Sequence, residues 1–455
     1  MAFIIKTLAV CVAVCSFLPA ILFADPLVIK NVKVLTMETD QVLEGQTVII
    51  SDGIVNWIGD DREADIPEGA EIITGDYYVM PGLAEMHAHI PSSQGGEQQM
   101  HDVLKLYLSQ GITTIRGMLG DPAHLELRRK AANGEIVSPR IFTSGPSFNG
   151  NSAADPETAR NAVREQAEAG YDLLKFHPGI PLESFEAITD EAAVQGIEFS
   201  GHISAEVGLE RSLAAGKGSI DHLDRYMEFL AGDAAQREDP PIIYFGYDLT
   251  PYVEEDKIEE AAIITKEAGV WNVPTNTLLE NVFNPDNTVE EMQNWPGMEF
   301  IPGNTVANWS GAVDQICSSD IYNEDQARAF LEIRKRLTLA LHQHEAGILL
   351  GADAPQIFNP PGFAAHRELA LLAEAGLTPF EALKTGTVHV GKYLDEENTT
   401  GKVAEGYRAD LILLSENPLE SIPFQEYIEG VIYQGKYLNR AQLDSLLEGL
   451  RQNVN

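Results

Sequence analysis

Residues 80–90 have the sequence Met-Pro-Gly-Leu-Ala-Glu-Met-His-Ala-His-Ile, and the predicted fold is organised around them. Their apolar start, with Tyr78 and Val79 before it, predicts a buried strand that leads into two histidines. Residues i and i+2 of a strand point to the same face, so His87 and His89 would aim two imidazoles at one point. A metal site needs such convergence. The motif alone is weak, because it also fits two ordinary strand histidines, one of them structural.

From residue 81 to about 394 the chain repeats a pattern of strand, loop and helix. The strands after the first are expected at 112–117, 140–146, 171–177, 197–202, 218–222, 270–275 and 347–353. Helical patterns lie between several of them, at 100–110, 156–169, 182–195 and 209–215. Eight strand-then-helix units predict an α/β fold, a closed parallel (β/α)8 TIM barrel. The connections 227–268 and 284–325 are long, and such insertions commonly form lids or pocket walls.

The two flanking regions, 25–80 and 395–438, have the alternating pattern of half-buried strands. In the first region, Asp52-Gly53 marks a hairpin turn between two such runs. In the second, glycines separate strands at 401–414 and 427–437. We expect both regions to combine in one small β-sandwich domain formed by both chain ends, with the barrel of residues 81–394 inserted in it. Residues 439–455 predict an amphipathic helical tail.

Residues 1–24 have the features of a secretory signal peptide. Lys6 is their only charge, the stretch from Thr7 to Ala24 is mostly apolar, and Ala24 precedes Asp25. Pro19 and the short length disfavour a retained membrane anchor. Removal of this segment leaves Cys317 as the only cysteine, so the mature chain has no internal disulfide. We expect the protein to be secreted or exported to the bacterial periplasm.

The formal net charge is −38 in 455 residues, with 69 acidic residues against 31 Lys and Arg. A surface this acidic excludes nucleic acid as a partner and, once the signal is removed, anionic membranes as well. It leaves small-molecule substrates, and it allows a homo-oligomer. Self-repulsion of this size is tolerated best where salt screens it.

Side chains that can bind metal ions stand at the carboxyl ends of the predicted barrel strands, where the active sites of such barrels lie. They are His87 and His89 on the first strand, Lys175 on the fourth, His202 on the fifth, His222 on the sixth and Asp353 on the eighth. Each also has a plainer interpretation. A strand-end histidine is often structural, Lys175 fits a surface lysine, and Asp353 fits a helix cap. Convergence of all six on one barrel mouth favours a metal centre.

This order of residues resembles that of the amidohydrolase superfamily, which has His-x-His on strand one, a carboxylated Lys on strand four, and His, His and Asp on strands five, six and eight. Residues 81–89 resemble the superfamily's strand-one signature, 377–387 the helix after strand eight, and 401–414 the return into the β domain. Residues 111–116 and 138–141 resemble the imidazolonepropionase-like branch, which includes Xaa-Pro and Xaa-Arg dipeptidases. Gly117 departs from the Asp that many relatives have after the strand-two Arg.

The resemblance implies a binuclear metal site. His87, His89 and Asp353 would hold one divalent metal ion and His202 and His222 the other, with Zn²⁺ as the expected metal. A CO₂-derived carbamate on Lys175 would bridge the two ions. A metal-bridging hydroxide would attack the substrate carbonyl, and Asp353 would be the catalytic base that passes the proton to the leaving nitrogen.

The function expected from this site is that of an exported amidohydrolase that cleaves the amide C–N bond of a dipeptide or an N-acyl amino acid. A lactone, a carbamate or a phosphotriester is the alternative substrate, and a non-catalytic metal-binding protein is a third hypothesis. Tyr226, Arg116 and His177 are candidates for substrate binding. Tyr226 fits packing at the barrel rim equally well, and His177 fits a lining residue of the mouth that never touches substrate.

Overall fold

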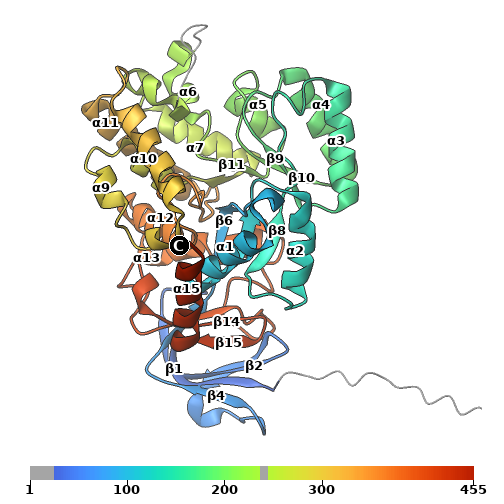
Figure 1. Cartoon of the computed structure of the whole chain (residues 1–455), viewed down its shortest axis with the longest axis vertical. Coiled ribbons are helices and arrows are strands. Elements are labelled where there is room, and N and C mark those ends of the chain that lie inside the picture. The colour runs from blue at the N-terminus through green and yellow to red at the C-terminus, as the bar shows by residue number, and fades with distance from the viewer. Residues whose placement is uncertain (1–24, 236–243, 455) are drawn as a thin grey trace, which may run out of the picture.

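The computed structural model describes residues 25–235 and 244–454. It has a mixed α/β fold, in which two parallel sheets lie among helices and one mixed sheet lies at one end of the molecule (Figure 1). The predicted signal peptide, residues 1–24, falls outside the described residues. Within the described ranges, no helix combines the length and the apolar character that crossing a membrane requires.

The mixed sheet takes strands from both ends of the chain, at the bottom of Figure 1. Its members are β1 (Leu27–Leu35), β2 (Val42–Ser51), β3 (Ile54–Asp60), β4 (Glu71–Thr74), β5 (Tyr78–Pro81), β13 (Leu411–Leu414), β14 (Ile428–Tyr433) and β15 (Lys436–Asn439). The order is β15-β14-β13-β5-β1-β2-β3, and β4 pairs with β1. The two ends meet where β13 runs antiparallel to β5. The predicted hairpin turn is confirmed, since Asp52 and Gly53 both have positive φ (54° and 74°), as a tight turn between twisted strands requires.

The parallel strands form one sheet of three and one of four. They are β6 (Leu83–Ala88), β7 (Ile112–Gly117) and β8 (Arg140–Thr143) in one, and β9 (Leu173–Phe176), β10 (Glu198–Gly201), β11 (Ser219–Asp221) and β12 (Trp271–Val273) in the other. Every residue of β6, β7, β9 and β11 is buried, which is the pattern of parallel strands covered on both faces. An isolated bridge from Ser144 to Leu173 joins the two sheets at one edge.

The predicted eighth strand, 347–353, is present only as an extended segment with isolated bridges. Ile348 bridges to Asn272 of β12, and Ala354 bridges to Ala88 of β6. Between them, Leu349 N donates to Asn272 O at 2.9 Å and Met86 N donates to Leu350 O at 2.8 Å. Positive φ at Gly347 (54°) and Asp353 (60°) leaves the β region at both ends, so regular pairing does not extend into a strand.

The predicted first strand is split at Gly82, because the chain changes sheets there. Gly82 N donates to Asp410 O at 2.7 Å, next to β13, whereas Leu83 N donates to Gly111 O at 3.0 Å, next to β7. A Cβ atom on Gly82 would lie 2.2 Å from Thr113 Oγ1. Only glycine fits this crossing without a shift of its neighbours, and the crossing directs β6 and its histidines into the parallel sheet.

Helices follow most parallel strands and cover the sheets (Figure 1). They are α1 (Glu97–Ser109), α2 (Pro122–Ala132), α3 (Pro156–Ala169), α4 (Leu182–Gln195), α5 (Gly208–Ala214), α8 (Asn276–Phe283), α11 (Glu324–Gln343), α12 (Phe363–Glu374), α13 (Pro379–Thr385) and α14 (Val388–Tyr393). Two of them, α3 and α4, have the predicted bounds. The side chain of Asp155 caps α3 by accepting from Glu157 N and Thr158 N, and Gly170 ends the helix at φ 82°.

The two long insertions also contain helices. The first holds α6 (Tyr226–Ala231) and α7 (Lys257–Ala268), and the second holds α9 (Val289–Met292) and α10 (Gly303–Cys317). The predicted C-terminal helix is α15 (Arg440–Val454), which packs on α1 and β14 and so connects the mixed sheet to the helical layer (Figure 1).

Candidate metal centre

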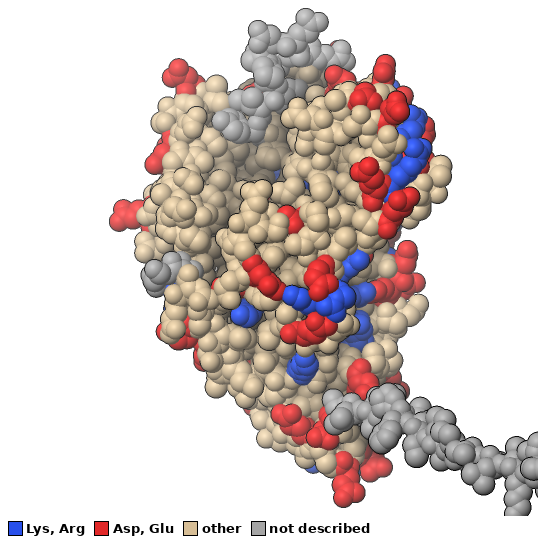
Figure 2. Space-filling model, turned by 45° about the vertical axis from the view of Figure 1, so that its right-hand side comes forward, with Lys and Arg blue, Asp and Glu red and all other residues tan. Residues whose placement is uncertain are grey.

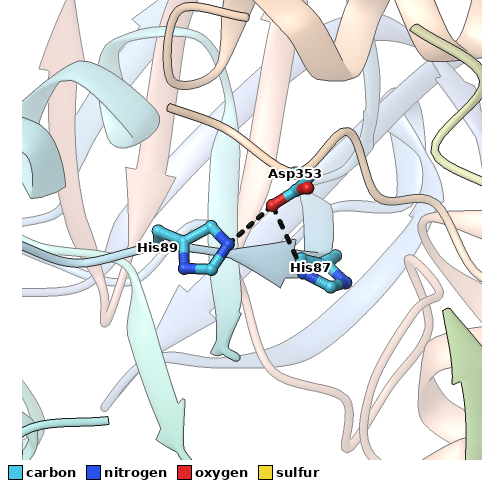
Figure 3. A group of neighbouring side chains, drawn as sticks. All are labelled: His87, His89 and Asp353. Carbon is cyan, nitrogen blue, oxygen red and sulfur yellow. Dashed lines mark hydrogen bonds and ion pairs between the residues drawn. The ribbon is translucent and has the colours of Figure 1, made fainter. Parts of the chain in front are cut away.

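Three of the predicted metal ligands meet where the carboxyl ends of the parallel strands share one edge (Figure 3). His87 lies near the end of β6, His89 directly after it, and Asp353 at the end of the extended segment. Nε2 of His89 is 2.6 Å from Oδ1 of Asp353, and Nε2 of His87 is 3.3 Å from the same oxygen. One ligand atom from each residue lies within 4.8 Å of the others. This is the spacing of donors around a single ion.

His202 and His222 follow β10 and β11 directly and lie beside this group. The ring centroids of His87 and His222 are 4.6 Å apart, and those of His202 and His222 are 4.5 Å apart. Nδ1 of His222 is 4.0 Å from Oδ2 of Asp353. The strand ends therefore bring together all four predicted histidines and the aspartate.

Lys175 lies beneath the histidines, on β9, and is fully buried. Its Nζ is 3.3 Å from Oδ2 of Asp221, and the same oxygen is 2.9 Å from Nδ1 of His87. Burial lowers the pKa of Lys175, and the nearby Asp221 and Asp353 only partly offset that effect. Burial by itself would raise the pKa of Asp221, but Lys175, His87 and Arg116 outweigh it and hold that pKa well below its usual value.

Two imidazoles of the centre, those of His87 and His222, are held in the neutral form that a metal ion requires. Burial, with Lys175 as the next cause, lowers the pKa of His87 to about 4. Burial, with His202 and His87 next, lowers the pKa of His222 well below its usual value. For Asp353, the effect of burial is outweighed by His87 and His89, and its pKa lies far below the usual value of an aspartate. Neutral imidazole nitrogens and an ionised carboxylate, converging in one buried place, fit a divalent cation.

Residues that sequence reasoning did not identify orient two of the histidines. Nδ1 of His202 is 2.8 Å from Oδ2 of Asp224, and Nδ1 of His222 is 2.8 Å from Oγ1 of Thr275. Because each Nδ1 is engaged by its partner, Nε2 is the nitrogen that each ring can offer to the centre. Asp221 directly precedes His222 in the sequence, and Asp224 follows it by two residues. This proximity to a predicted ligand is the local signal that could have identified the two aspartates.

Glu85 connects the two chain segments that carry the first group of ligands. It is fully buried, and its Oε1 accepts from Ala352 N at 2.7 Å and from His87 N at 3.3 Å. Burial raises its pKa well above the usual value of a glutamate. The backbone at the centre is strained as well, with φ of 63° at His222, 47° at Thr275 and 60° at Asp353. Such values in residues other than glycine cluster at functional sites.

The three candidates for substrate binding have different surroundings. Arg116 points into the space beneath the centre, where it donates to Met86 O at 2.7 Å and to Ser219 Oγ at 2.9 Å, and it is almost fully buried. The hydroxyl of Tyr226 is bonded to Thr265 Oγ1 and Asn272 Oδ1, away from the centre, which favours the packing interpretation. His177 alone lines the pocket, and its ring centroid is 5.2 Å from that of His202. Burial, with Lys175 next, lowers its pKa to about 3.

A pocket of about 320 Å³ opens above the centre. The metal-ligand candidates His87, His89, His202, His222 and Asp353, together with His177, form one side of it. The other lining residues are Leu119, Phe245, Leu278, Leu279, Val282, Phe283, Ile316, Gln356 and Ile357. Phe245 comes from the first long insertion and Ile316 from the second, so the prediction that insertions supply pocket walls is confirmed for these two residues.

Comparison with known proteins gives one family and several relatives. A model described as amidohydrolase family matches residues 78–438. The chain is 23% identical to ochratoxinase of Aspergillus niger over 458 aligned residues, which cover 84% of this chain and 80% of that protein. A solved structure of a putative prolidase from Bifidobacterium longum is 25% identical, with a TM-score of 0.68 over 94% of this chain and 99% of that one. Bottromycin amidohydrolase, 21% identical, has the same fold, with a TM-score of 0.70 over 94% of this chain and 90% of that one.

Proposed function

The chain belongs to the amidohydrolase family, and we propose that it is a metal-dependent hydrolase that cleaves the amide C–N bond of a dipeptide or an N-acyl amino acid. One observation carries the proposal: His87, His89 and Asp353 present donor atoms within 4.8 Å of one another at the base of a pocket. The similarity to ochratoxinase and to the putative prolidase supports amide hydrolysis.

His87, His89 and Asp353 would hold one divalent metal ion, and His202 and His222 a second. When bound, the metal ions, which we propose to be zinc, supply Lewis-acid polarisation of the substrate carbonyl and make a water molecule more acidic. Asp353 would accept the proton of the attacking water and deliver it to the leaving nitrogen. His177, neutral and facing the pocket, would donate a hydrogen bond to the carbonyl oxygen as negative charge develops there.

Lys175 would carry the bridging carboxylate. Its burial favours the neutral amine, which is the form that reacts with CO₂ to give a carbamate and a proton. Arg116 would act from below: by holding Met86 O and Ser219 Oγ, it connects β6 to β11, the two strands that carry His87 and Asp221.

We infer further that the seven parallel strands and the segment 348–354 close into the predicted (β/α)8 barrel. Support comes from the bridges at Ser144, Ile348 and Ala354, which join the edges of the two sheets. We likewise infer that residues 81–394 form the barrel and that residues 25–80 and 395–438 together form one small β domain. We also propose that residues 1–24 direct export of the protein. The exported protein would take its metal and its substrate from the periplasm or the medium.

The decisive assay measures hydrolysis by the zinc-loaded protein of a panel that contains dipeptides, N-acyl amino acids, a lactone and a phosphotriester. We expect amide cleavage that is lost on chelation and restored by zinc. Turnover of only the lactone or the phosphotriester would replace the amide proposal with the alternative chemistry. A zinc-loaded protein inert towards the whole panel would instead support a metal-binding role.

A further inference from the structure

Apart from the histidines and Asp353, the lining of the pocket is almost entirely apolar, and we call this part of the lining the apolar side. Its side chains are Leu119, Phe245, Leu278, Leu279, Val282, Phe283, Ile316 and Ile357, and Gln356 is the one polar member outside the histidine side among the described lining residues. Neither Lys nor Arg lines the pocket within the described part of the chain. In a protein with a net charge of −38, the described lining thus offers no side-chain cation to a substrate anion.

Helix α8 forms the largest part of this apolar side and is rigidly supported. Glu368 accepts from Asn276 N at 3.0 Å and from Thr277 N at 2.7 Å, which fixes the first turn of the helix. At the other end, the ring of Phe283 stacks on Tyr247, with 4.6 Å between centroids and 15° between planes. Supported at both ends, the apolar surface is already formed before a ligand arrives, so little ordering opposes binding.

Phe245 closes the pocket from the side of the first insertion. Its ring stacks on His202, with centroids 6.2 Å apart and planes 21° apart, and its centroid is 5.4 Å from that of His222. Its φ of 58° lies in the left-handed region, which is rare for a bulky residue and which the surrounding structure must impose. The consequence is an aromatic face held against two of the proposed metal ligands.

We propose that the substrate carries a large apolar group, an aromatic ring or a branched aliphatic chain, that occupies the space between Phe245 and α8 while the scissile amide lies at the histidines. The inference rests on the proposed function and narrows it to amides with such a group on one side of the scissile bond. A pocket of about 320 Å³ has the volume of about ten liquid waters, so it holds a small molecule and not a polypeptide. Apolar contact with the described lining selects the substrate.

The test uses the zinc-loaded, full mature protein and two series of N-acyl amino acids. One series keeps glycine and changes the acyl group from acetyl to benzoyl; the other keeps acetyl and changes glycine to leucine and phenylalanine. We expect kcat/KM to rise by about 10-fold or more along one of the series, since even one methylene in an apolar pocket is worth about 10–200-fold. The series that rises identifies which side of the amide the apolar surface contacts.

Ile316→Ala and Ile321→Ala form a matched pair of variants. Ile316 is half-buried and lines the pocket, whereas Ile321 is 44% exposed, lies five residues further on and is outside the pocket. We expect Ile316→Ala to reduce the preference for the larger substrate, measured as a ratio of kcat/KM values, by about 10-fold. Ile321→Ala should leave that ratio unchanged. An unchanged ratio in Ile316→Ala would overturn the inference.

Failure of the inference and failure of the proposed function give different results. Equal kcat/KM values throughout both series overturn the inference and leave amide hydrolysis standing. If no amide is hydrolysed, the proposed function fails, and calorimetric binding of uncleavable ketomethylene analogues then decides. Tighter binding of the benzoyl or phenylalanine analogue than of the acetyl-glycine analogue supports the apolar site, and equal affinities overturn it.

Discussion

Asp353→Asn separates the two roles proposed for this residue, metal ligand and proton carrier. Oδ1 of Asp353 lies 2.6 Å from Nε2 of His89 and 3.3 Å from Nε2 of His87, and an asparagine keeps an oxygen of the same size there. Asparagine also tolerates the φ of 60° at this position, so the variant should fold. What it loses is the negative charge and the ability to take a proton.

We expect most of the metal to remain, because the side-chain oxygen and the two histidines are kept. General acid–base catalysis contributes about 10²–10⁴-fold to turnover. At 1.36 kcal/mol per factor of ten, that range is about 2.7–5.4 kcal/mol of transition-state free energy. The predicted signature is therefore a kcat lower by at least 10²-fold with nearly unchanged metal content.

The assay combines kcat for the best amide substrate with metal content by elemental analysis, and Asp224→Asn is its control. Asp224 is also buried and contacts His202 Nδ1 at 2.8 Å, but it does not line the pocket. Loss of such an outer carboxylate typically costs about 10–100-fold in metal affinity. The control should therefore lose metal first and recover much of its kcat at saturating zinc. Near-wild-type turnover in Asp353→Asn would refute the role of Asp353 as proton carrier.

Three further predictions follow from the same structure. Lys175→Ala should lose metal and activity and regain part of both when a short carboxylic acid is added, whereas Lys175→Arg should not be rescued because its guanidinium stays charged. The assay measures metal content and turnover of the two variants with and without acetate. A fully active Lys175→Arg would contradict the bridging role. Gly82→Ala should lower the free energy of unfolding by about 1–3 kcal/mol, because its Cβ would lie 2.2 Å from Thr113 Oγ1. In urea unfolding, Gly449→Ala should instead raise the free energy of unfolding, because Gly449 is a helical position with open space around it. Intact mass of exported protein should correspond to a chain that starts near Asp25, and a membrane-bound species that still carries Met1 would indicate an anchor.

Much of the fold could be predicted because its determinants are local. The bounds of α3 follow from Asp155 before it, Pro156 at its first turn and Gly170 after it, and the hairpin follows from Asp52-Gly53. The strand ends also place His202 and His222 correctly beside His87, since parallel strands that begin together end at a common edge. Periodicity in the sequence contains this information.

The supporting residues could not be predicted, because they depend on pairings between distant segments. Nothing in the local sequence says that Thr275 reaches His222, 53 residues away. The packing of Gly82 against Thr113, which splits the predicted strand, depends on the register of β6 against β7. The direction in which Arg116 points, into the space beneath the centre, is fixed by acceptors on β6 and β11. Register across a sheet is a tertiary property that no single segment determines.

Asp221 affects the conditions under which the modification proposed for Lys175 would form. With its Nζ 3.3 Å from Oδ2 of Asp221, a protonated Lys175 has a counter-ion in a site that excludes water. Conversion to a carbamate removes that cation and places a second anion beside the carboxylate, and two like charges at such a distance repel each other strongly in a buried site. Arg116, 3.5 Å from the other oxygen of Asp221, already pairs with that carboxylate and offsets only part of the repulsion. The proposed carbamate would therefore be favourable only together with divalent cations, and we expect metal binding and lysine modification to appear and disappear as one event.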